Sequence, residues 1–412
     1  MIAVEQALET ILSRIKVLGT ERMDILSGRG RVLAQDIHAS LNVPPFDNSA
    51  MDGYAVKFSD IAGSSAENPA RLKVIGDLPA GYSFSPTLQS GEALRIMTGA
   101  PMPDGADTVI MQEDTQTHET FVRILKAGSR GANIRRAGED IRKGDRLIPA
   151  GTKLRPAQIG ILASTRRACI SVFQRPRVAI LSTGDELVDI DEEITEGKIV
   201  TSNSYSLTAL VAECGGIPVT LGIARDTKEA LKERLLEGLH ADIILSSGGV
   251  SVGDYDFVKD VLEELGLDMQ FWKVSIRPGK PLAFGILGGK PCFGLPGNPV
   301  SAMVSFEQFV IPALRKMSGH KNLFQPTVTA IAEEKVTTKK GLKYFVRCRI
   351  KPTEGSYRAT TTGEQGSGIL MSMAAANGLM IVPEDQETIL PGDRVKVQIL
   401  DREFGFTEKP DY

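Results

Sequence analysis

The chain has 412 residues, of which 42% are hydrophobic and 24% charged, and its formal net charge is −3. This length predicts about two to four domains, and the composition is that of an ordinary soluble globular protein. The small net charge excludes a global attraction to nucleic acid or to an anionic membrane, so any anion site must be local.

Cysteine and histidine are scarce and scattered. The four cysteines form no CxxC pair, and the four histidines form no pair at helical spacing. This pattern argues against a zinc site and against a disulfide framework. Residues 1–15 lack the order of a signal peptide, and no apolar run is long enough to span a membrane. We therefore expect a cytoplasmic protein that binds neither nucleic acid nor membrane.

The chain opens with a helical pattern and then changes texture. Leu8, Ile11 and Ile15 recur at helical spacing and predict an opening helix that stops near Gly19. The apolar stripe of this helix must pack either on another domain or on a second subunit. From about residue 42 to residue 138, prolines and glycines separate short apolar runs, which predicts a small β domain.

The clearest pattern begins at residue 177, where strands and helices alternate. Strands are predicted at residues 178–181, 217–223 and 242–246, with extended segments around Trp272 and at 282–286, and helices at about 202–214, 227–239, 257–265 and 300–317. Ser202 or Asn203 is a candidate cap for the first of these helices. Such alternation is typical of a doubly wound α/β domain with a largely parallel sheet.

After Pro326 the helical patterns stop. Short strand patterns follow at residues 328–331, 344–350, 357–360, 379–382 and 395–400. They predict a separate C-terminal β domain.

Chemically distinctive residues follow the predicted strands, where open α/β sheets bind their ligands. These positions hold carboxylates, glycine turns and cations, namely Asp185, Glu186, Asp226, Gly248, Gly249, Ser251, Asp256, Arg277, Lys280 and the turn 294–299. Glycines let main-chain N–H groups approach a phosphate closely. Carboxylates beside an anion require a divalent cation between them, and oxygen ligands favour Mg²⁺. The edge therefore predicts a site for a phosphate-bearing ligand with Mg²⁺.

Each of these features also has an ordinary structural alternative. Asp226 could cap a helix or lie in a solvated turn, and Lys280 could be a solvated surface charge. Gly248 and Gly249 could form a simple tight turn. The turn 294–299 could be a rigid connection to a helix that starts at Pro299. Convergence on one edge favours the functional interpretation.

Two strings in the N-terminal half show neither helical nor strand period. Residues 44–55 combine prolines, an aromatic pair and two aspartates, and residues 95–103 lead into a proline-rich stretch. The structural alternatives are a loop capped by Asp47 and Asn48 and a strand that enters a turn.

Seven strings together resemble the signature segments of the MoeA family, to which the gephyrin E domain belongs. In chain order they are SAMDGYA (49–55), TGAP (98–101), STGDE (182–186), SGGVS (247–251), PGKP (278–281), GLPGNP (294–299) and TTGEQGS (361–367). Any one string is weak, whereas seven in the family's order are specific. The resemblance covers essentially the whole chain.

The resemblance implies a multidomain α/β plus β fold in an elongated, homodimeric subunit. The implied domains are a discontinuous helical dimerisation domain (1–45 and 139–175), an inserted β domain (46–138), a MogA-like doubly wound α/β molybdopterin-binding domain (176–325) and a C-terminal β-barrel domain (326–412). The active site is expected between the α/β domain of one subunit and the N-terminal β domain and C-terminal barrel of the other.

The resemblance also implies a function, that of a Mg²⁺-dependent molybdopterin molybdenumtransferase. Such an enzyme inserts molybdenum from molybdate into adenylylated molybdopterin with release of AMP, in the final step of molybdenum cofactor biosynthesis. The implied substrates are molybdopterin-adenylate and molybdate. The adenylyltransferase of the preceding step and apo-molybdoenzymes are implied partners.

Functional residues are carried over from the family motifs. The catalytic candidates are Asp52, Thr98, Asp140, Glu186, Lys273 and Arg277. The substrate-binding candidates are Ser182, Gly248, Gly249, Ser251, Lys280, Pro296, Pro299, Arg347 and Ser367, and the metal candidates are Glu186, Asp226 and Asp256. Arg277 stands where the resemblance leads us to expect lysine; arginine keeps the charge but presents a planar fork.

Three other functions compete with this hypothesis. The same reaction with tungstate differs only in a similar oxyanion, which metal competition would reveal. A scaffold protein of the same fold would tolerate substitution of the strand-end carboxylates, and a pterin-binding protein without turnover would release no nucleotide.

Overall fold

The computed structural model describes residues 1–248, 257–353, 355–401 and 404. The chain divides into two compact units, one formed by Met1–Glu21 with Val172–Tyr412 and the other by Arg22–Ser171. We call them the α/β–barrel unit and the inserted unit, and each is described by itself. The helices in the described part of the chain are all too short or too polar to traverse a lipid bilayer.

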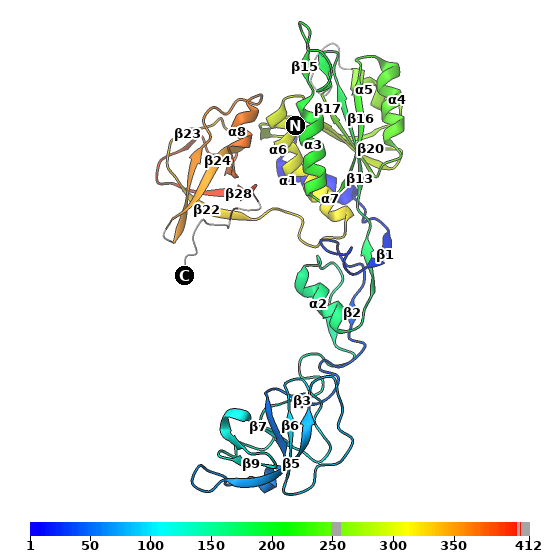
Figure 1. Cartoon of the computed structure of the whole chain (residues 1–412). Coiled ribbons are helices and arrows are strands. Elements are labelled where there is room, and N and C mark those ends of the chain that lie inside the picture. Colours follow the sequence, from blue (N-terminus) through cyan, green and yellow to red (C-terminus); the bar gives the residue numbers. More distant parts are fainter. Residues whose placement is uncertain (249–256, 354, 402–403, 405–412) are drawn as a thin grey trace. The chain divides into compact units, whose positions relative to one another are not determined.

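A six-stranded sheet organises the α/β–barrel unit (Figure 1). Its order is β16-β13-β17-β21-β20-β18, with bounds β13 (Arg177–Thr183), β16 (Ile217–Ala224), β17 (Ile243–Ser247), β18 (Asp268–Lys273), β20 (Pro281–Leu287) and β21 (Lys290–Leu295). The pairings among β16, β13, β17 and β21 are parallel, and β20 runs antiparallel to both its neighbours. The predicted largely parallel sheet is confirmed, although β21 was not among the predicted strands.

Helices cover both faces of this sheet, as the doubly wound pattern predicts. Their bounds are α3 (Ser202–Glu213), α4 (Lys228–Gly238), α5 (Phe257–Glu264), α6 (Pro299–Ser305) and α7 (Ile311–Met317). Val178 and Ile180 of β13 enter the hydrophobic cluster under α3, α6 and α7, whereas Ala179 and Leu181 enter the cluster under α4. Neighbouring strand residues point to opposite faces, so a strand covered on both faces is apolar throughout.

The last predicted helix of this domain is interrupted. A π-helical segment, Phe306–Val310, separates α6 from α7. Pro312 lies at the start of α7 and lacks the N–H that would continue the regular helical bonding, which accounts for the local change of period.

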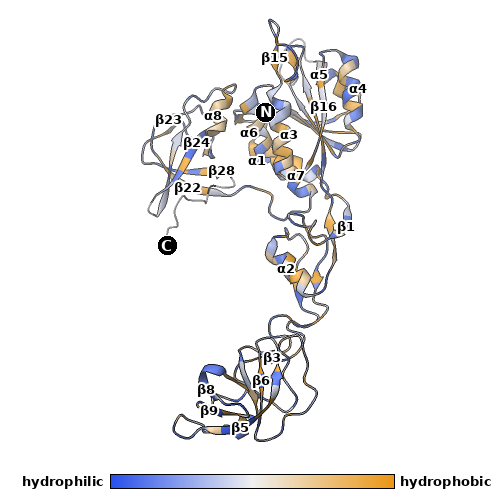
Figure 2. Cartoon of the chain, viewed as in Figure 1, coloured by the Kyte–Doolittle hydropathy of each residue, from blue (hydrophilic) through white to orange (hydrophobic). Residues whose placement is uncertain are grey.

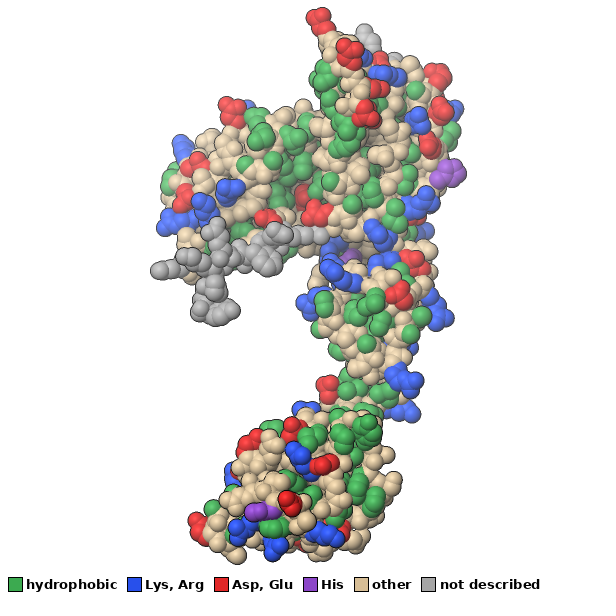
Figure 3. Space-filling view, viewed as in Figure 1, with side chains coloured by type: hydrophobic (Ala, Val, Ile, Leu, Met, Phe, Trp, Pro, Cys, Tyr) green, Lys and Arg blue, Asp and Glu red, His purple; other side chains and the backbone are tan. Residues whose placement is uncertain are grey.

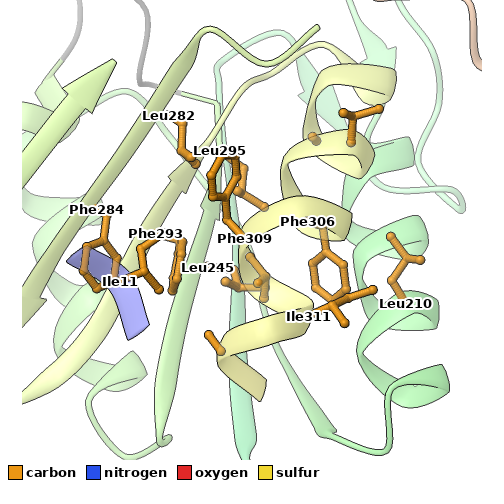
Figure 4. Close-up of a cluster of buried hydrophobic side chains, with 14 of the residues drawn as sticks. Ile11, Leu210, Leu245, Leu282, Phe284, Phe293, Leu295, Phe306, Phe309 and Ile311 are labelled. Carbon is orange, nitrogen blue, oxygen red and sulfur yellow. The ribbon is translucent and has the colours of Figure 1, made fainter. Parts of the chain in front are cut away.

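The opening helix α1 (Val4–Arg14) packs on this sheet. Its buried residues Val4, Ala7 and Ile11 join the cluster that contains Phe284 and Phe293, as Figure 4 shows for Ile11. The hydrophobic positions of α1, α3 and α7 are orange in Figure 2. In the division into two compact units, residues 1–21 group with the α/β–barrel unit. The helical period correctly gave the buried face but could not identify the surface that covers it.

The C-terminal part of the same unit is a closed barrel. Its strands are β22 (Thr327–Ala332), β24 (Lys343–Thr353), β25 (Ser356–Thr361), β26 (Gly378–Val382) and β28 (Arg394–Ile399), closed by the pairing of β24 with β26. Short strands β23 (Val336–Thr337) and β27 (Thr388–Ile389) pair beside it. All five predicted strands are confirmed. The expectation that helices stop after residue 326 is wrong at α8 (Leu370–Ala374), which is too short to show a period.

A strand from the α/β region extends the barrel sheet. β19 (Ile276–Arg277) pairs in parallel with β24, placing Ile276 opposite Lys343 and Arg277 opposite Tyr344. The Lys343 ammonium also forms an ion pair with Glu5 of α1. The barrel is therefore attached to the α/β region by main-chain pairing and by charge.

The inserted unit is largely β structure. Its main sheet has the order β7-β4-β6-β5-β9-β8, with bounds β4 (Gly53–Val56), β5 (Ala70–Leu78), β6 (Glu92–Ile96), β7 (Thr108–Met111), β8 (Thr115–Thr117) and β9 (Phe121–Ile124). Two small pairs, β2 (Ile37–His38) with β11 (Arg146–Ile148) and β3 (Asn48–Ser49) with β10 (Ile134–Arg135), and the helix α2 (Pro156–Ser164) complete it. β1 (Thr20–Asp24) and β12 (Cys169–Phe173) pair where the chain passes from one unit to the next. The exact bounds of the four predicted domains stay a prediction.

Replacement of Ile11 tests the contribution of α1. Ile11 is fully buried, so Ile11→Ala removes apolar contact and leaves a cavity, and we expect the free energy of unfolding to fall by about 2–4 kcal/mol. Urea denaturation followed by circular dichroism measures this loss. Glu9→Ala, on the exposed side of the same helix, is the matched control. Equal stability of the two variants would contradict the assignment of α1 to this core.

Candidate active site

Four strand ends lie together at one edge of the parallel sheet. The register places Ser182 opposite Ser247, Thr183 opposite Ala224, and Ser247 opposite Leu295. The residues that follow these strands therefore leave the sheet at the same edge. The structure confirms that Asp185, Asp226 and Gly248 share this edge with the turn 296–298.

Two carboxylates face each other at this edge. The main-chain N–H of Asp185 donates to Asp226 Oδ2 at 3.3 Å, and the N–H of Asp226 donates to Asp185 Oδ1 at 3.2 Å. Sequence reasoning ranked Glu186 above Asp185, but the Glu186 carboxylate folds back toward the space that a side chain on Gly184 would need. A carboxylate directly after a strand was the available signal for Asp185, and its pairing with Asp226 could not be seen from the sequence.

The surroundings of the Asp226 carboxyl disfavour its charged form. The pKa of the Asp226 carboxyl is raised above its ordinary value, chiefly because partial burial disfavours the charged form. The negative charges of Asp185 and Glu186 add to the rise, and the hydrogen bond from Asp185 opposes it. Further acidic side chains gather at the end of the unit that carries β14 (Leu187–Val188) and β15 (Ile199–Val200) (Figure 3).

The donor set suits a hard divalent cation that keeps part of its water shell. Within residues 1–248, 257–353 and 355–401, no group of three or more His, Cys, Asp or Glu side chains is arranged to hold a metal. Mg²⁺, however, commonly binds through one or two carboxylates together with water and substrate phosphate. Asp185 and Asp226 fit that pattern. The third predicted ligand, Asp256, lies outside the described residues.

The raised pKa of Asp226 predicts a pH-dependent gain of stability in Asp226→Asn. A carboxyl whose pKa is raised on folding contributes stability below the unfolded pKa and loses it as the pH rises through the folded pKa. At pH 7 the charged Asp226 therefore opposes folding. We expect Asp226→Asn to raise the melting temperature at pH 7. The gain in free energy of unfolding should be less than about 1 kcal/mol, because the Asp226 side chain is partly exposed.

The same comparison below about pH 4 should show no difference, since both side chains are then neutral. Differential scanning fluorimetry at the two pH values measures the change, with the exposed Asp191→Asn as the control. A pH-independent difference between wild type and Asp226→Asn would contradict the assignment.

The hydroxyl and glycine positions at the edge are tightly packed. Ser182 is 1% exposed, and its Oγ lies 2.7 Å from Ser204 Oγ at the start of α3. Gly248 has a positive φ of 95°, and a Cβ there would lie 2.6 Å from the carbonyl oxygen of Thr183. Only glycine allows that approach. The predicted residues Gly249 and Ser251 lie outside the described residues.

The turn after β21 connects this edge to the barrel. Pro296 is buried, while Gly297 and Asn298 are exposed and Pro299 is the first residue of α6. The main-chain N–H of Val300 donates to the carbonyl oxygen of Ser367 at 3.1 Å. The residue that follows the string 294–299 is thus hydrogen-bonded to the last residue of the string 361–367.

A buried guanidinium holds the second of these strings in place. Arg347 is 0% exposed and donates to the main-chain oxygens of Glu364, Gln365 and Gly366 and to Ser372 Oγ, at distances from 2.9 to 3.3 Å. Burial lowers the pKa of Arg347. With its donors directed at the loop, Arg347 fixes the loop conformation, and direct binding of substrate by Arg347 stays a prediction.

A cationic groove lies where β19 meets the barrel. It has a volume of about 250 Å³, and its lining includes Arg277, Lys339, Tyr344, Arg347 and Gln365. The exposed Arg277 guanidinium carbon lies 5.7 Å from the centre of the Tyr344 ring. Lys339 and Gln365 were not predicted; Gln365 lies within the recognised string 361–367, which was the one available signal for it.

The two other predicted cations lie near this strand. Lys273 is the last residue of β18 and is partly buried, and its carbonyl accepts the N–H of Ile2. Lys280 is exposed beside Gly279. No ion pair engages either side chain within the described part of the chain.

In the inserted unit, two predicted strings are joined by one carboxylate. Asp52 Oδ1 accepts both the N–H and the hydroxyl of Thr98, each at 2.7 Å. The hydroxyl contributes most to lowering the pKa of Asp52, and the N–H adds to it. Both residues are exposed, so the Asp52 carboxylate remains accessible in its charged form. Asp140 is also exposed, and its N–H donates to Val43.

Loss of the Thr98 hydroxyl should raise the pKa of Asp52. Thr98→Val removes the strongest hydrogen bond to the charged carboxylate and keeps the main-chain donor. A titration of the Asp52 carboxyl by carbon NMR measures the shift. Ser90→Ala, which removes a hydrogen bond from Asp60 in the same unit, is the control and should leave Asp52 unchanged. An unaltered Asp52 titration in Thr98→Val would disprove the interaction.

Fold and site together define a multidomain protein of the α/β plus β-barrel type with a glycine-lined acidic edge and a neighbouring cationic groove. Three family models match along the chain. They are described as the MoeA N-terminal region (domain I and II), a probable molybdopterin binding domain and the MoeA C-terminal region (domain IV), and they cover residues 2–165, 179–316 and 329–400.

Relatives named molybdopterin molybdenumtransferase match over almost the full chain. A molybdopterin molybdenumtransferase of Nostoc sp. is 40% identical over 92% of this chain and 88% of its own, and one of Haemophilus influenzae is 36% identical over 98% and 100%. A crystal structure of the MoeA protein from Pyrococcus horikoshii OT3 superposes with a TM-score of 0.85 at 32% identity, covering 97% of this chain and 100% of that one. The chain belongs to the MoeA family of molybdopterin molybdenumtransferases.

Proposed function

We propose that this protein is the enzyme that completes molybdenum cofactor, a molybdopterin molybdenumtransferase. It takes molybdopterin-adenylate and molybdate as substrates, transfers molybdenum to the pterin dithiolene and releases AMP. The observation that carries the proposal is the hydrogen bond from Val300, directly after the strand-end turn 294–299, to Ser367 of the barrel loop 361–367, whose Gln365 lines the cationic groove. The acidic edge, which suits a nucleotide phosphate, and the cationic groove, which suits an oxyanion, therefore belong to one unit.

The groove suits molybdate, a compact dianion. Arg277 offers a planar fork of N–H donors, and Lys339 adds a charged donor from the barrel side. Lys273 and Lys280 lie close to Arg277 in the sequence and increase the positive field around this segment. Charge-assisted hydrogen bonds of this kind are stronger than those between neutral groups.

The acidic edge suits the phosphate portion of the substrate together with Mg²⁺. Asp185 and Asp226, with Glu186 and Asp256 as further candidates, would hold the ion. When bound, Mg²⁺ would offset the negative charge that develops as the phosphoanhydride is cleaved. The chain's own contribution is orientation, because Gly248 and the turn 296–298 place main-chain groups at the same edge. Asp52, held by Thr98, is the candidate for handling a proton.

The proposal also covers the oligomeric state, the cellular location and the partners of the protein. We expect a cytoplasmic homodimer, with the dimer bringing the inserted unit of one subunit to the α/β–barrel unit of the other. The adenylyltransferase of the preceding step would supply the substrate, and apo-molybdoenzymes would receive the product. The family relation supports these expectations.

AMP release provides the direct test. We expect the purified chain, mixed with molybdopterin-adenylate and Mg²⁺, to release AMP only when molybdate is added, as measured by chromatography. Arg277→Ala should raise the molybdate concentration for half-maximal rate by about tenfold, equivalent to about 1.4 kcal/mol, because one charged donor is lost from the groove.

The exposed Lys335→Ala, in the same barrel segment but absent from the groove lining, is the matched control. If no AMP is released at any molybdate concentration, the enzymatic proposal is contradicted and a binding or scaffold role is favoured. Tungstate supplied in parallel distinguishes the two metals by the concentration that each requires.

A further inference from the structure

Asn203 occupies an unexpected place at the acidic edge. The sequence suggested Ser202 or Asn203 as the cap of α3, but Thr201 is the N-cap residue and no side chain caps the helix there. The prediction of a cap at 202 or 203 is therefore wrong. The Asn203 side chain instead turns away from its own helix and toward the sheet.

The amide of Asn203 links two different strand-end turns. Its Nδ2 donates to Ser247 Oγ at 2.7 Å and to the carbonyl oxygen of Gly297 at 2.8 Å. Because the Gly297 carbonyl can only accept, the orientation of the amide is fixed by this contact. Both N–H groups of Asn203 are used, one for the end of β17 and one for the turn after β21.

The link is buried although the turns are accessible. Asn203 is 8% exposed and Ser247 is 2% exposed, while Gly297 is exposed. Asn203 Oδ1 is itself buried and has no hydrogen-bond partner. A polar group in such surroundings costs stability unless its bonds are made, so the two donated bonds matter more than exposed ones would.

A main-chain hydrogen bond also joins these two segments in the described part of the chain. The β17–β21 ladder ends at Ser247 and Leu295, and beyond it the N–H of Gly248 donates to the carbonyl oxygen of Leu295 at 3.2 Å. The backbones then approach closely, since a Cβ on Gly297 would lie 3.7 Å from the Cα of Gly248. A shift of either turn would alter the spacing of main-chain groups that the proposed function assigns to phosphate.

We infer that Asn203 is a positioning residue that sets the spacing of the Gly248 and Gly297 turns and thereby the affinity of this edge for the nucleotide phosphate. Asn203 touches no substrate and acts through the two turns. The inference rests on the proposed function for the identity of the ligand, whereas the link between the turns stands independently of it.

Two variants of Asn203 separate the link from the side-chain volume. Asn203→Ala removes the amide, and Asn203→Asp at pH 8 keeps the shape but loses both N–H donors. Thr208→Val on the same helix is the control, because Thr208 Oγ1 is likewise buried and makes no hydrogen bond to either turn in the described part of the chain. Ser247→Ala removes one of the two acceptors and keeps the Gly297 bond, so it serves if either Asn203 variant fails to fold.

The first measurement is hydrogen exchange of the Gly248 amide in the full-length protein without ligand. We expect faster exchange in both Asn203 variants, a smaller increase in Ser247→Ala, and none in Thr208→Val. Unchanged exchange in a folded Asn203 variant would overturn the positioning role, whatever the protein binds.

The second measurement is the dissociation constant of AMP by calorimetry, together with steady-state kinetics. We expect AMP to bind about tenfold more weakly to both Asn203 variants, and KM for molybdopterin-adenylate to rise more than kcat falls. Faster exchange with undiminished AMP affinity would sink the claim that the link serves the phosphate site. Absence of AMP binding by the wild type would count against the proposed function and against the ligand named here, while the exchange result still decides the link itself.

Discussion

The common register of four parallel strands is the constraint on which the candidate site depends. Parallel strands in one sheet must end on the same side, so residues more than a hundred positions apart in the sequence leave the sheet as neighbours. Asp185, Asp226, Gly248 and Gly297 are brought together in this way, and none of them contacts another through a sequence-local motif. The helices that pack on both faces hold the strands in place, and the fixed strand ends set where the following loops begin.

A second structural constraint comes from the buried positive charge of Arg347. The guanidinium of Arg347 is fully buried on the face of β24 opposite Val346 and Cys348, and it donates mainly to carbonyl oxygens of one loop. Because an unpaired buried charge is costly, the loop has little freedom to rearrange. Ser367 at its end meets the first turn of α6, and so the conformation of a barrel loop is tied to the edge of a different sheet.

The sequence predicted the architecture better than the contacts. The strands β13, β16 and β17 were found because burial on both faces makes them apolar runs, whereas β21 was missed because Pro291 and Gly294 interrupt its pattern. The strand-end rule located Asp226, Gly248 and the turn 294–299. This rule could not reveal that Asp185 is hydrogen-bonded to Asp226 or that Asn203 links two turns. It also could not reveal that the Arg347 side chain binds the loop 364–366.

Those contacts were hidden for a physical reason. Each depends on the direction of one side chain and on a partner supplied by a distant segment, and residue type and spacing specify neither. The helical period of α1 shows the same limit, since it gave the buried face correctly but not the surface that receives it. Family resemblance supplied the names of functional residues, and the structure supplied the interactions among them.

The position of α1 has a consequence for how the protein is made. Ile11 lies in one buried cluster with Phe293, on a strand that is synthesised some 280 residues later, because the inserted unit and most of the sheet are made in between. During translation the inserted unit can complete its own sheet while the apolar face of α1 has no partner. The helix α1 is therefore synthesised long before the strands that bury it, and it remains a candidate for chaperone capture until the sheet has formed.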